Sequence, residues 1–352
     1  MTELLESFNS AYELYTVFTE QADRLIRAGT DPSVVASMRK NTEESTMKFF
    51  ADKVSANGIC AVTLQDREYP DLLREISDPP AVLFYRGDIS AASRGLCVSM
   101  VGSRNASWKG LTATEKIARE LSLSGISIVS GLADGIDSAA HKGCIAGKSP
   151  TVAVMGCGLD RVYPVTNSDL AKRILDSDGL LLSEFAPGEK PLGWHFPIRN
   201  RIISGMSRAT LMMECRIRSG SMTTVRHALE QGREVYAYPG DTNSPWAEGS
   251  HQLLREGAVY FTSASDVIED LADLGYLDKS QCCVQNNVCQ PVQTELTPAQ
   301  RRITDAMKDG AASFDELSAA TGLSSQELFS ALTVLMIKGI VRACPGKTYE
   351  LQ

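Results

Sequence analysis

Short apolar runs that end in glycine alternate with stretches of helical spacing through the middle of this chain. Three of these runs are LCVSMVG (residues 96–102), ISIVSG (126–131) and TVAVMGCG (151–158), each of a length that suits a buried strand. Amphipathic stretches over residues 112–123 and around Ala139 separate them and predict helices. Strands that alternate with helices in this way predict a parallel sheet with helices on both faces.

Further strands are predicted near Leu180, Ala209 and Glu234. Ligands of such sheets bind at the carboxyl ends of the strands, where a glycine lets a phosphate approach the backbone and the start of the next helix. Glycines stand at four of the predicted strand ends: Gly102, Gly131, Gly156 and Gly240. We therefore expect a ligand site along this edge of the sheet.

The regions on either side of this core have different patterns. Residues 1 to about 50 alternate polar and apolar positions at helical spacing, and Asp31-Pro32 predicts a helix start. Residues 278–294 lack periodicity and predict a flexible tether. Three helices and a closing hairpin are predicted after Thr297-Pro298, an arrangement typical of a winged helix.

The expected fold class is thus α/β. Its core is an extended Rossmann-like, mainly parallel sheet at about residues 90 to 275, flanked by a small helical N-terminal domain and a C-terminal winged-helix-like domain. The expected ranges are 1–85 for the helical domain, 86–277 for the core, 278–294 for the linker and 295–352 for the winged-helix-like domain.

The charge distribution points to one stretch of the core. The chain has a formal net charge of -8, yet the segment from Lys190 to Arg218 carries six Lys and Arg against Glu214 alone. Trp194 and Phe196 stand within a few residues of those cations. Cations beside flat rings suit a ligand that has phosphates and bases. The alternative is a charged loop between two strands.

Composition excludes several other classes. No apolar run approaches the roughly 18 residues that a membrane span needs, and the first residues lack the pattern of a secretion signal. The nine cysteines are scattered, and the closest group, Cys282, Cys283 and Cys289, has no second pair to complete a zinc site. We therefore expect no metal and no membrane partner, and a reducing compartment, by default the cytoplasm.

The motifs of nucleotide cofactors are missing. Gly102-Ser103-Arg104-Asn105 stands where a dinucleotide fold needs G-x-G-x-x-G, and no P-loop motif occurs. Arg104 would project a cation into the space of a dinucleotide's phosphates, which favours a terminal or backbone phosphate. We expect no cofactor.

Catalytic motifs are weak as well. Ser219-Gly220-Ser221 precedes a predicted helix but is not G-x-S-x-G, so it suits a phosphate cradle better than a nucleophile. The four histidines lie far apart in the sequence, and Asp137 has the place of a helix-capping residue. We expect no catalytic residue.

At these positions the chain resembles the DNA-processing protein A family, also called DprA or Smf. The motifs keep the family's order over about residues 60 to 270. They are Val101 to Arg104, Ser130 to Asp137 with Ala140-His141, Phe196 to Gly205, Ser219 to Ser221, and Gln231 to Val235.

The resemblance implies a function. Members bind incoming single-stranded DNA in natural transformation, the uptake of DNA by competent cells, protect it, and help load the RecA recombinase for recombination. They hold the strand in a basic pocket of an extended Rossmann fold, form homodimers through that core, and are not known as enzymes. For this chain the implied partners are single-stranded DNA, RecA and a second copy of itself.

Roles carry over by motif. Arg104 matches a phosphate-contacting arginine after the first strand, and Phe196 falls in an aromatic-basic motif that contacts bases, with Arg199 and Arg201 beside it. The expected DNA-binding residues are Gly102, Ser103, Arg104, Lys142, Phe196, Arg199, Asn200, Arg201, Ser219, Gly220 and Ser221.

Other readings stay open. A Rossmann-type nucleotide phosphoribohydrolase is the alternative, since Pro239-Gly240-Asp241-Thr242 partly matches the loop of such enzymes, and a scaffold that docks an acidic protein is a third. Apolar positions such as Leu253, Leu254, Val259 and Phe261 are candidates for the dimer contact. The C-terminal region has six basic and seven acidic residues, which argues against DNA reading there.

Overall fold

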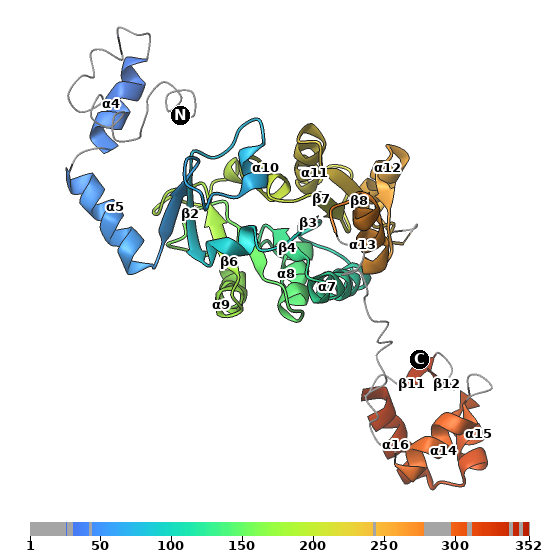
Figure 1. The fold of residues 1–352 in the computed structure, drawn as a ribbon. Coiled ribbons are helices and arrows are strands. Elements are labelled where there is room, and N and C mark those ends of the chain that lie inside the picture. The colour runs from blue at the N-terminus through green and yellow to red at the C-terminus, as the bar shows by residue number, and fades with distance from the viewer. Residues whose placement is uncertain are drawn as a thin grey trace. The chain divides into compact units, whose positions relative to one another are not determined.

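The computed structural model describes residues 26, 31–41, 44–241, 244–277, 297–307, 312–337, 341–344 and 348–351. The chain divides into two compact units, Met1–Cys282 and Cys283–Gln352 (Figure 1). The expected tether at 278–294 and nearly all of the first thirty residues lie outside the described residues.

A nine-stranded sheet forms the centre of the first unit, in the order β1-β2-β6-β5-β4-β3-β7-β8-β9. All pairs from β6 to β9 are parallel, and the two pairs that involve β2 are antiparallel. The mainly parallel sheet is therefore confirmed. Its strands are β1 (Cys60–Thr63), β2 (Val82–Gly87), β3 (Cys97–Val101), β4 (Ser127–Ser130), β5 (Thr151–Val154), β6 (Leu180–Ser183), β7 (Ala209–Met212), β8 (Glu234–Ala237) and β9 (Val259–Tyr260).

Helices cover both faces of the sheet because strand side chains alternate between them. Val152 and Val154 of β5 pack in one apolar cluster, with helices α6, α10 and α11, whereas Ala153 packs on the opposite face, with α9. Helices α7, α8 and α13 also cover that second face (Figure 1). The helices are α6 (Asp71–Arg74), α7 (Trp108–Leu123), α8 (Ile136–Ile145), α9 (Ser168–Asp176), α10 (His195–Gly205), α11 (Ser221–Glu230), α12 (Glu248–Arg255) and α13 (Ala264–Asp273), with 3-10 turns at Ile89–Ala92 and Val165–Asn167.

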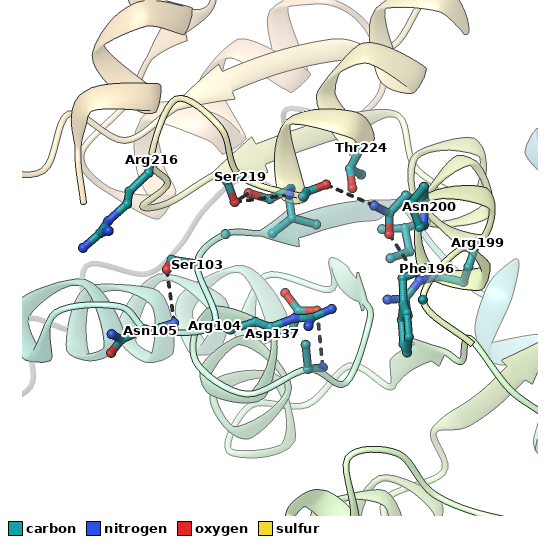
Figure 2. A pocket seen from close by; sticks show the side chains of 18 of the residues that line it. Ser103, Arg104, Asn105, Asp137, Phe196, Arg199, Asn200, Arg216, Ser219 and Thr224 are labelled. Atoms are coloured by element: carbon teal, nitrogen blue, oxygen red, sulfur yellow. Dashed lines mark hydrogen bonds between the residues drawn. The ribbon is translucent and has the colours of Figure 1, made fainter. Parts of the chain in front are cut away.

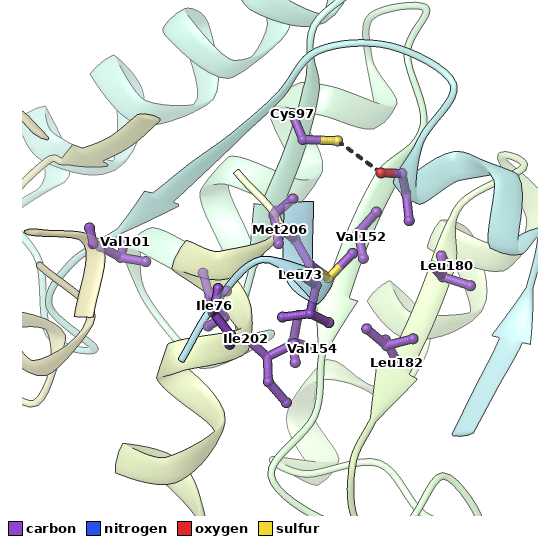
Figure 3. Packing of buried hydrophobic residues seen from close by; sticks show 14 of the residues in the cluster. Leu73, Ile76, Cys97, Val101, Val152, Val154, Leu180, Leu182, Ile202 and Met206 are labelled. Atoms are coloured by element: carbon purple, nitrogen blue, oxygen red, sulfur yellow. Dashed lines mark hydrogen bonds between the residues drawn. The ribbon is translucent and has the colours of Figure 1, made fainter. Parts of the chain in front are cut away.

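The sheet begins earlier than we expected. Its first two strands, β1 and β2, precede residue 90, and the expected core boundary at residue 86 falls inside β2. Leu83 of β2 and Leu73 of α6 are fully buried, and Figure 3 shows Leu73 among side chains of α10 and of the central strands. Both strands are short runs flanked by turn residues, which resemble connectors in the sequence.

Among the described residues, helices α4 (Pro32–Asn41) and α5 (Glu44–Ala56) precede the sheet. The predicted start at Asp31-Pro32 is confirmed, since Asp31 Oδ1 accepts a hydrogen bond from Ser33 N at 2.7 Å. The end of α5 contacts the core, where Lys53 Nζ lies 3.3 Å from Asp160 Oδ2.

Strand order also fixes where a crevice opens. From β3 the chain winds outward through β4, β5 and β6, and then returns to the other side of β3 with β7, β8 and β9. A reversal of this kind leaves a crevice beyond the carboxyl ends of the two strands that flank it, here β3 and β7. Residues 102–105 and 213–220 follow those strands, so two of the predicted binding motifs meet there.

The candidates for a dimer contact need correction. Leu253 is 4% exposed and Phe261 is fully buried, and both pack in the core. Val259 is 37% exposed, and its neighbour Tyr260 is 60% exposed. The sequence does not distinguish an apolar residue that packs in the core from one on the surface, so the burial of each side chain decides which candidates remain.

The second unit has the predicted winged-helix architecture. Thr297 caps its first helix, as expected, and Ile303, Leu317 and Leu332 are among its core residues. A strand that we did not predict, β10, joins the closing hairpin in the order β10-β12-β11. The elements are α14 (Pro298–Ala306), β10 (Ala312–Ser313), α15 (Phe314–Thr321), α16 (Ser325–Ile337), β11 (Val341–Cys344) and β12 (Thr348–Leu351).

One core histidine couples folding to pH. His141 of α8 is fully buried, with Nδ1 2.8 Å from Thr151 Oγ1, while that hydroxyl donates to Ile128 O at 2.8 Å. Nδ1 is therefore the donor of the pair, and the ring is neutral. Burial above all, with the charge of Arg199 added, lowers the pKa of His141 from 6.5 to about 3.

The neutral ring predicts acid sensitivity. Since only the unfolded chain protonates His141 between about pH 6.5 and 3, the free energy of unfolding should fall as the pH drops through that window. The histidine alone should account for about 2 kcal/mol between pH 7 and pH 5. Urea unfolding at both pH values should show a smaller loss for His141→Gln than for the wild type. Equal losses would contradict this origin.

Candidate nucleic-acid interface

A cavity of about 720 Å³ lies at the crevice between β3 and β7 (Figure 2). Its walls come mainly from the segments that follow these strands and from helices α10 and α11, and loops elsewhere in the core add Ala133, Tyr163 and Trp246. Nine of the eleven predicted binding residues line it: Gly102, Ser103, Arg104, Phe196, Arg199, Asn200, Ser219, Gly220 and Ser221.

A buried carboxylate positions the loop that carries Arg104. Glu214, just after β7, is 2% exposed, and its side chain accepts hydrogen bonds from Ser107 N at 2.8 Å and Ser107 Oγ at 2.7 Å. Its carbonyl accepts another from Ser103 N at 2.6 Å. The loop is thus fastened at both ends to the far side of the crevice. Glu214 was not predicted, although it is the single acid of the basic segment.

The start of α8 packs directly beneath this loop. Ile136 N donates to Ser103 O at 3.1 Å. Gly135 has a φ of +78°, and a Cβ there would lie 2.3 Å from Ser103 O. Only glycine combines that backbone conformation with so close an approach.

Arg104 and Phe196 form a cation–π pair at the cavity wall. The guanidinium carbon of the exposed Arg104 lies 5.4 Å from the ring centroid. The ring is half-buried, because it packs against Gly156, where a Cβ would lie 2.9 Å from the ring, and against Tyr163 at a centroid distance of 5.6 Å. Phe196 is therefore a rigid ring that keeps part of its surface open to the cavity.

Arg199 forms the floor of the cavity. It is 4% exposed, and its Nη1 donates to Gly131 O at 2.9 Å and to Val154 O. Burial lowers its pKa to about 10, against the opposing effect of the Asp137 carboxylate, so it stays charged at neutral pH. It contributes a fixed positive potential from below.

Asp137 also differs from its expected role as a helix cap. Its carboxylate accepts hydrogen bonds from Gly131 N at 3.2 Å and Ala133 N at 3.4 Å, and no side chain caps α8 at Gly135. Burial raises the pKa of Asp137, and the nearby charge of Arg199 opposes that effect. Both side chains line the base of the cavity.

Two predicted binding residues lie elsewhere. Arg201 is buried against Glu184 at 2.7 Å and Asp78 at 3.1 Å, and it does not line the cavity. Residues two positions apart on a helix face different sides, so Arg201 diverges from Arg199 along α10. Lys142 is exposed on α8 and is likewise absent from the lining.

The basic segment as a whole is dispersed by the fold. Arg208 precedes β7, at the opposite edge of the sheet, and its guanidinium carbon lies 5.3 Å from the ring of Tyr276. Arg199 and Arg216 are the members of the segment's six cations that line the cavity. The number of cations in this sequence segment is therefore larger than the number that lie together at the cavity.

The start of α11 closes one side of the cavity. Ser219 Oγ and Ser221 Oγ lie 2.7 Å apart, and Asn200 Nδ2 donates to Thr223 Oγ1 at 2.7 Å, which ties α10 to this turn. A Cβ at Gly220 would meet no heavy atom within 4 Å, so the turn is open. An open helix start of this kind favours an anion.

Among the wall residues that sequence reasoning missed are Tyr163, Arg216 and Trp246. Arg216 belongs to the basic segment, but the two aromatic residues stand alone in distant loops and leave no local signal. None of the histidines lines this cavity. Within the described ranges no group of three His, Cys, Asp or Glu could hold a metal ion, and no helix is long and apolar enough to cross a membrane.

Comparison with known proteins agrees with this architecture. The profile of the DNA recombination-mediator protein A family matches residues 60–272, and that of the DprA winged helix domain matches residues 290–347. The DNA processing protein DprA of Bacillus subtilis (strain 168) is 41% identical over 216 residues, which is 61% of this chain and 72% of that protein.

Two solved structures are also similar. The X-ray structure of DNA processing protein A from Streptococcus pneumoniae has a TM-score of 0.66 at 36% identity, and the match covers 76% of this chain and 91% of that one. DNA processing protein A from Helicobacter pylori has a TM-score of 0.56 at 28% identity, over 63% of this chain and 99% of that one. The chain therefore belongs to the DNA recombination-mediator protein A family, whose members are also named DprA or Smf.

Proposed function

We propose that this protein binds single-stranded DNA in the cavity between β3 and β7, and does so without catalysing a reaction. The observation that carries the proposal is the Arg104–Phe196 pair at the carboxyl edge of the sheet, 5.4 Å from cation to ring centroid. A cation and an open ring together suit a phosphate and its base, whatever the sequence. The similar Helicobacter pylori protein is described by its single-stranded DNA binding mode, which supports the proposal.

Each wall has a role in this proposal. Arg104 contacts a phosphate, Phe196 stacks on a base, and the start of α11 receives a second phosphate through Ser219, Gly220 and Ser221. Arg199 adds its fixed charge from the floor. This environment suits a polyanion better than a reaction, because the side chains of the wall include no nucleophile with an adjacent base.

The cellular role that we propose follows the family resemblance. The protein would protect incoming DNA during natural transformation in the cytoplasm and help load the RecA recombinase on it. We also propose that the winged helix contacts protein and does not read DNA, since α16 carries Glu327 and no cation over Ser325–Ile337.

The first prediction concerns Arg104. Arg104→Ala should weaken binding to oligonucleotides of every sequence, and it should flatten the salt dependence by about 0.7 in the slope of log K against log salt. Arg119→Ala, at an exposed position of α7 outside the cavity lining, is the matched control and should leave both quantities unchanged. The measurement is oligonucleotide affinity across a salt series, with thermal melts to check folding. Unchanged affinity in a folded Arg104→Ala protein would place the site elsewhere.

The second prediction concerns Phe196. Phe196→Ala should cost roughly 1–3 kcal/mol of binding free energy with little change in the salt slope, because stacking involves no counterion. Since Arg104 already lies over the ring, the double variant should lose less than the sum of the two single losses. Additive losses in the same titrations would mean that the two side chains act separately.

The third prediction concerns assembly. We propose a homodimer formed through the first unit, because two cavities on one strand raise the effective concentration of each for the DNA. Of the predicted contacts, exposed Val259 remains a candidate and its exposed neighbour Tyr260 joins it, whereas Leu253 and Phe261 are buried. Sedimentation at micromolar concentration should show a dimer that Tyr260→Glu dissociates. A monomeric wild type would refute the proposal.

A further inference from the structure

A second cation–π pair lines the same cavity. The guanidinium carbon of Arg216 lies 5.2 Å from the ring of Trp246, and both residues belong to the wall. Arg216 follows β7, and Trp246 stands in the loop before α12. This pair therefore comes from different segments than Arg104 and Phe196, yet it has the same chemistry.

The two pairs lie at different ends of the cavity. Figure 2 shows Arg216 at one end and Phe196 with Arg199 at the other, with Ser219 between them. The open turn at Gly220 thus faces the middle of the cavity. A phosphate held at this turn would have an aromatic platform on either side.

The burial and hydrogen bonding of the Trp246 side chain support a role beyond packing. Its ring is half-buried, and its Nε1 is buried with no hydrogen-bond partner among the described residues. A buried donor without a partner costs about 1–3 kcal/mol. Hydrogen bonding therefore does not account for the position of this ring, and its exposed part is open to the cavity.

The size of the cavity agrees with two platforms. Its volume of about 720 Å³ lies in the upper part of the range of about 300–1,000 Å³ that is typical for sites of drug-sized ligands. A single base stacked on Phe196 would leave the Arg216 end empty.

We propose that Arg216 and Trp246 form a second base-stacking platform, so that the cavity holds two neighbouring nucleotides with the phosphate between them at the start of α11. This inference rests on the proposed single-stranded DNA binding and extends it to a second base. Trp246 stacks on that base, and Arg216 holds the ring in place and reaches the outer phosphate.

An abasic strand separates stacking from phosphate contacts. Trp246→Ala should weaken binding of a thymidine 12-mer by about 5- to 150-fold and leave binding of an abasic 12-mer unchanged. Tyr276→Ala is the matched control, because Tyr276 also pairs with an arginine, Arg208 at 5.3 Å, but lies outside the cavity lining. It should change neither affinity.

Fluorescence gives an independent readout. In a Trp108→Phe, Trp194→Phe protein, Trp246 is the remaining tryptophan, and the thymidine 12-mer should quench its emission whereas the abasic strand should not. Absence of quenching during tight binding would overturn the second platform, as would equal loss of both strands by Trp246→Ala.

These outcomes also separate the two proposals. If Phe196→Ala weakens the thymidine strand but Trp246→Ala does not, the cavity binds DNA at one base, and the second platform falls alone. If the wild-type protein binds neither strand, the proposed function fails and this inference fails with it.

Discussion

The geometry of the cavity depends on one buried carboxylate. Glu214 stands where β7 ends, and it binds the backbone and hydroxyl of Ser107 across the crevice. The Ser107 hydroxyl in turn accepts a hydrogen bond from Gly110 N and caps the first turn of α7, so these bonds fix the loop between β3 and α7. A Cβ at Gly110 would lie 2.3 Å from the carboxyl carbon, so α7 is close because that position has no side chain. The position of Arg104 follows from this contact.

The sequence was sufficient for the central fold because its signals were local and redundant. Each of β3, β4 and β5 is an apolar run with a glycine close behind, and a helical repeat follows. The strands β1 and β2 were missed because turn residues flank them, although Val82 to Tyr85 of β2 is a short apolar run; in β1, Cys60 and Ala61 are exposed and weaken the pattern. Ser183 of β6, which pairs with Phe84 of β2, lies about a hundred residues further along the chain. Sequence periodicity carries no information on such a distant strand partner.

The motifs of the candidate site could be predicted from the sequence, but the directions of its charged side chains could not. Residues at strand ends and helix starts must gather at one edge, and Ser103 and Ser219 do so. The direction of an arginine within a helix is decided by tertiary partners, such as Glu184 and Asp78 for Arg201. These partners are not neighbours of Arg201 in the sequence, so the sequence pattern does not reveal them. For the same reason the lone aromatic residues Tyr163 and Trp246 could be recognised only from the fold.

The pairing of β2 with β6 also has a consequence for the edge of the sheet. β6 would end the parallel sheet with a free row of backbone donors and acceptors if β2 did not cover it. A core cut at residue 86 would expose that edge and the pocket that Leu73 and Leu83 fill. The segment before residue 86 therefore moves the free edge of the sheet out to β1, a strand of four residues, and a short edge strand offers few backbone groups to another chain.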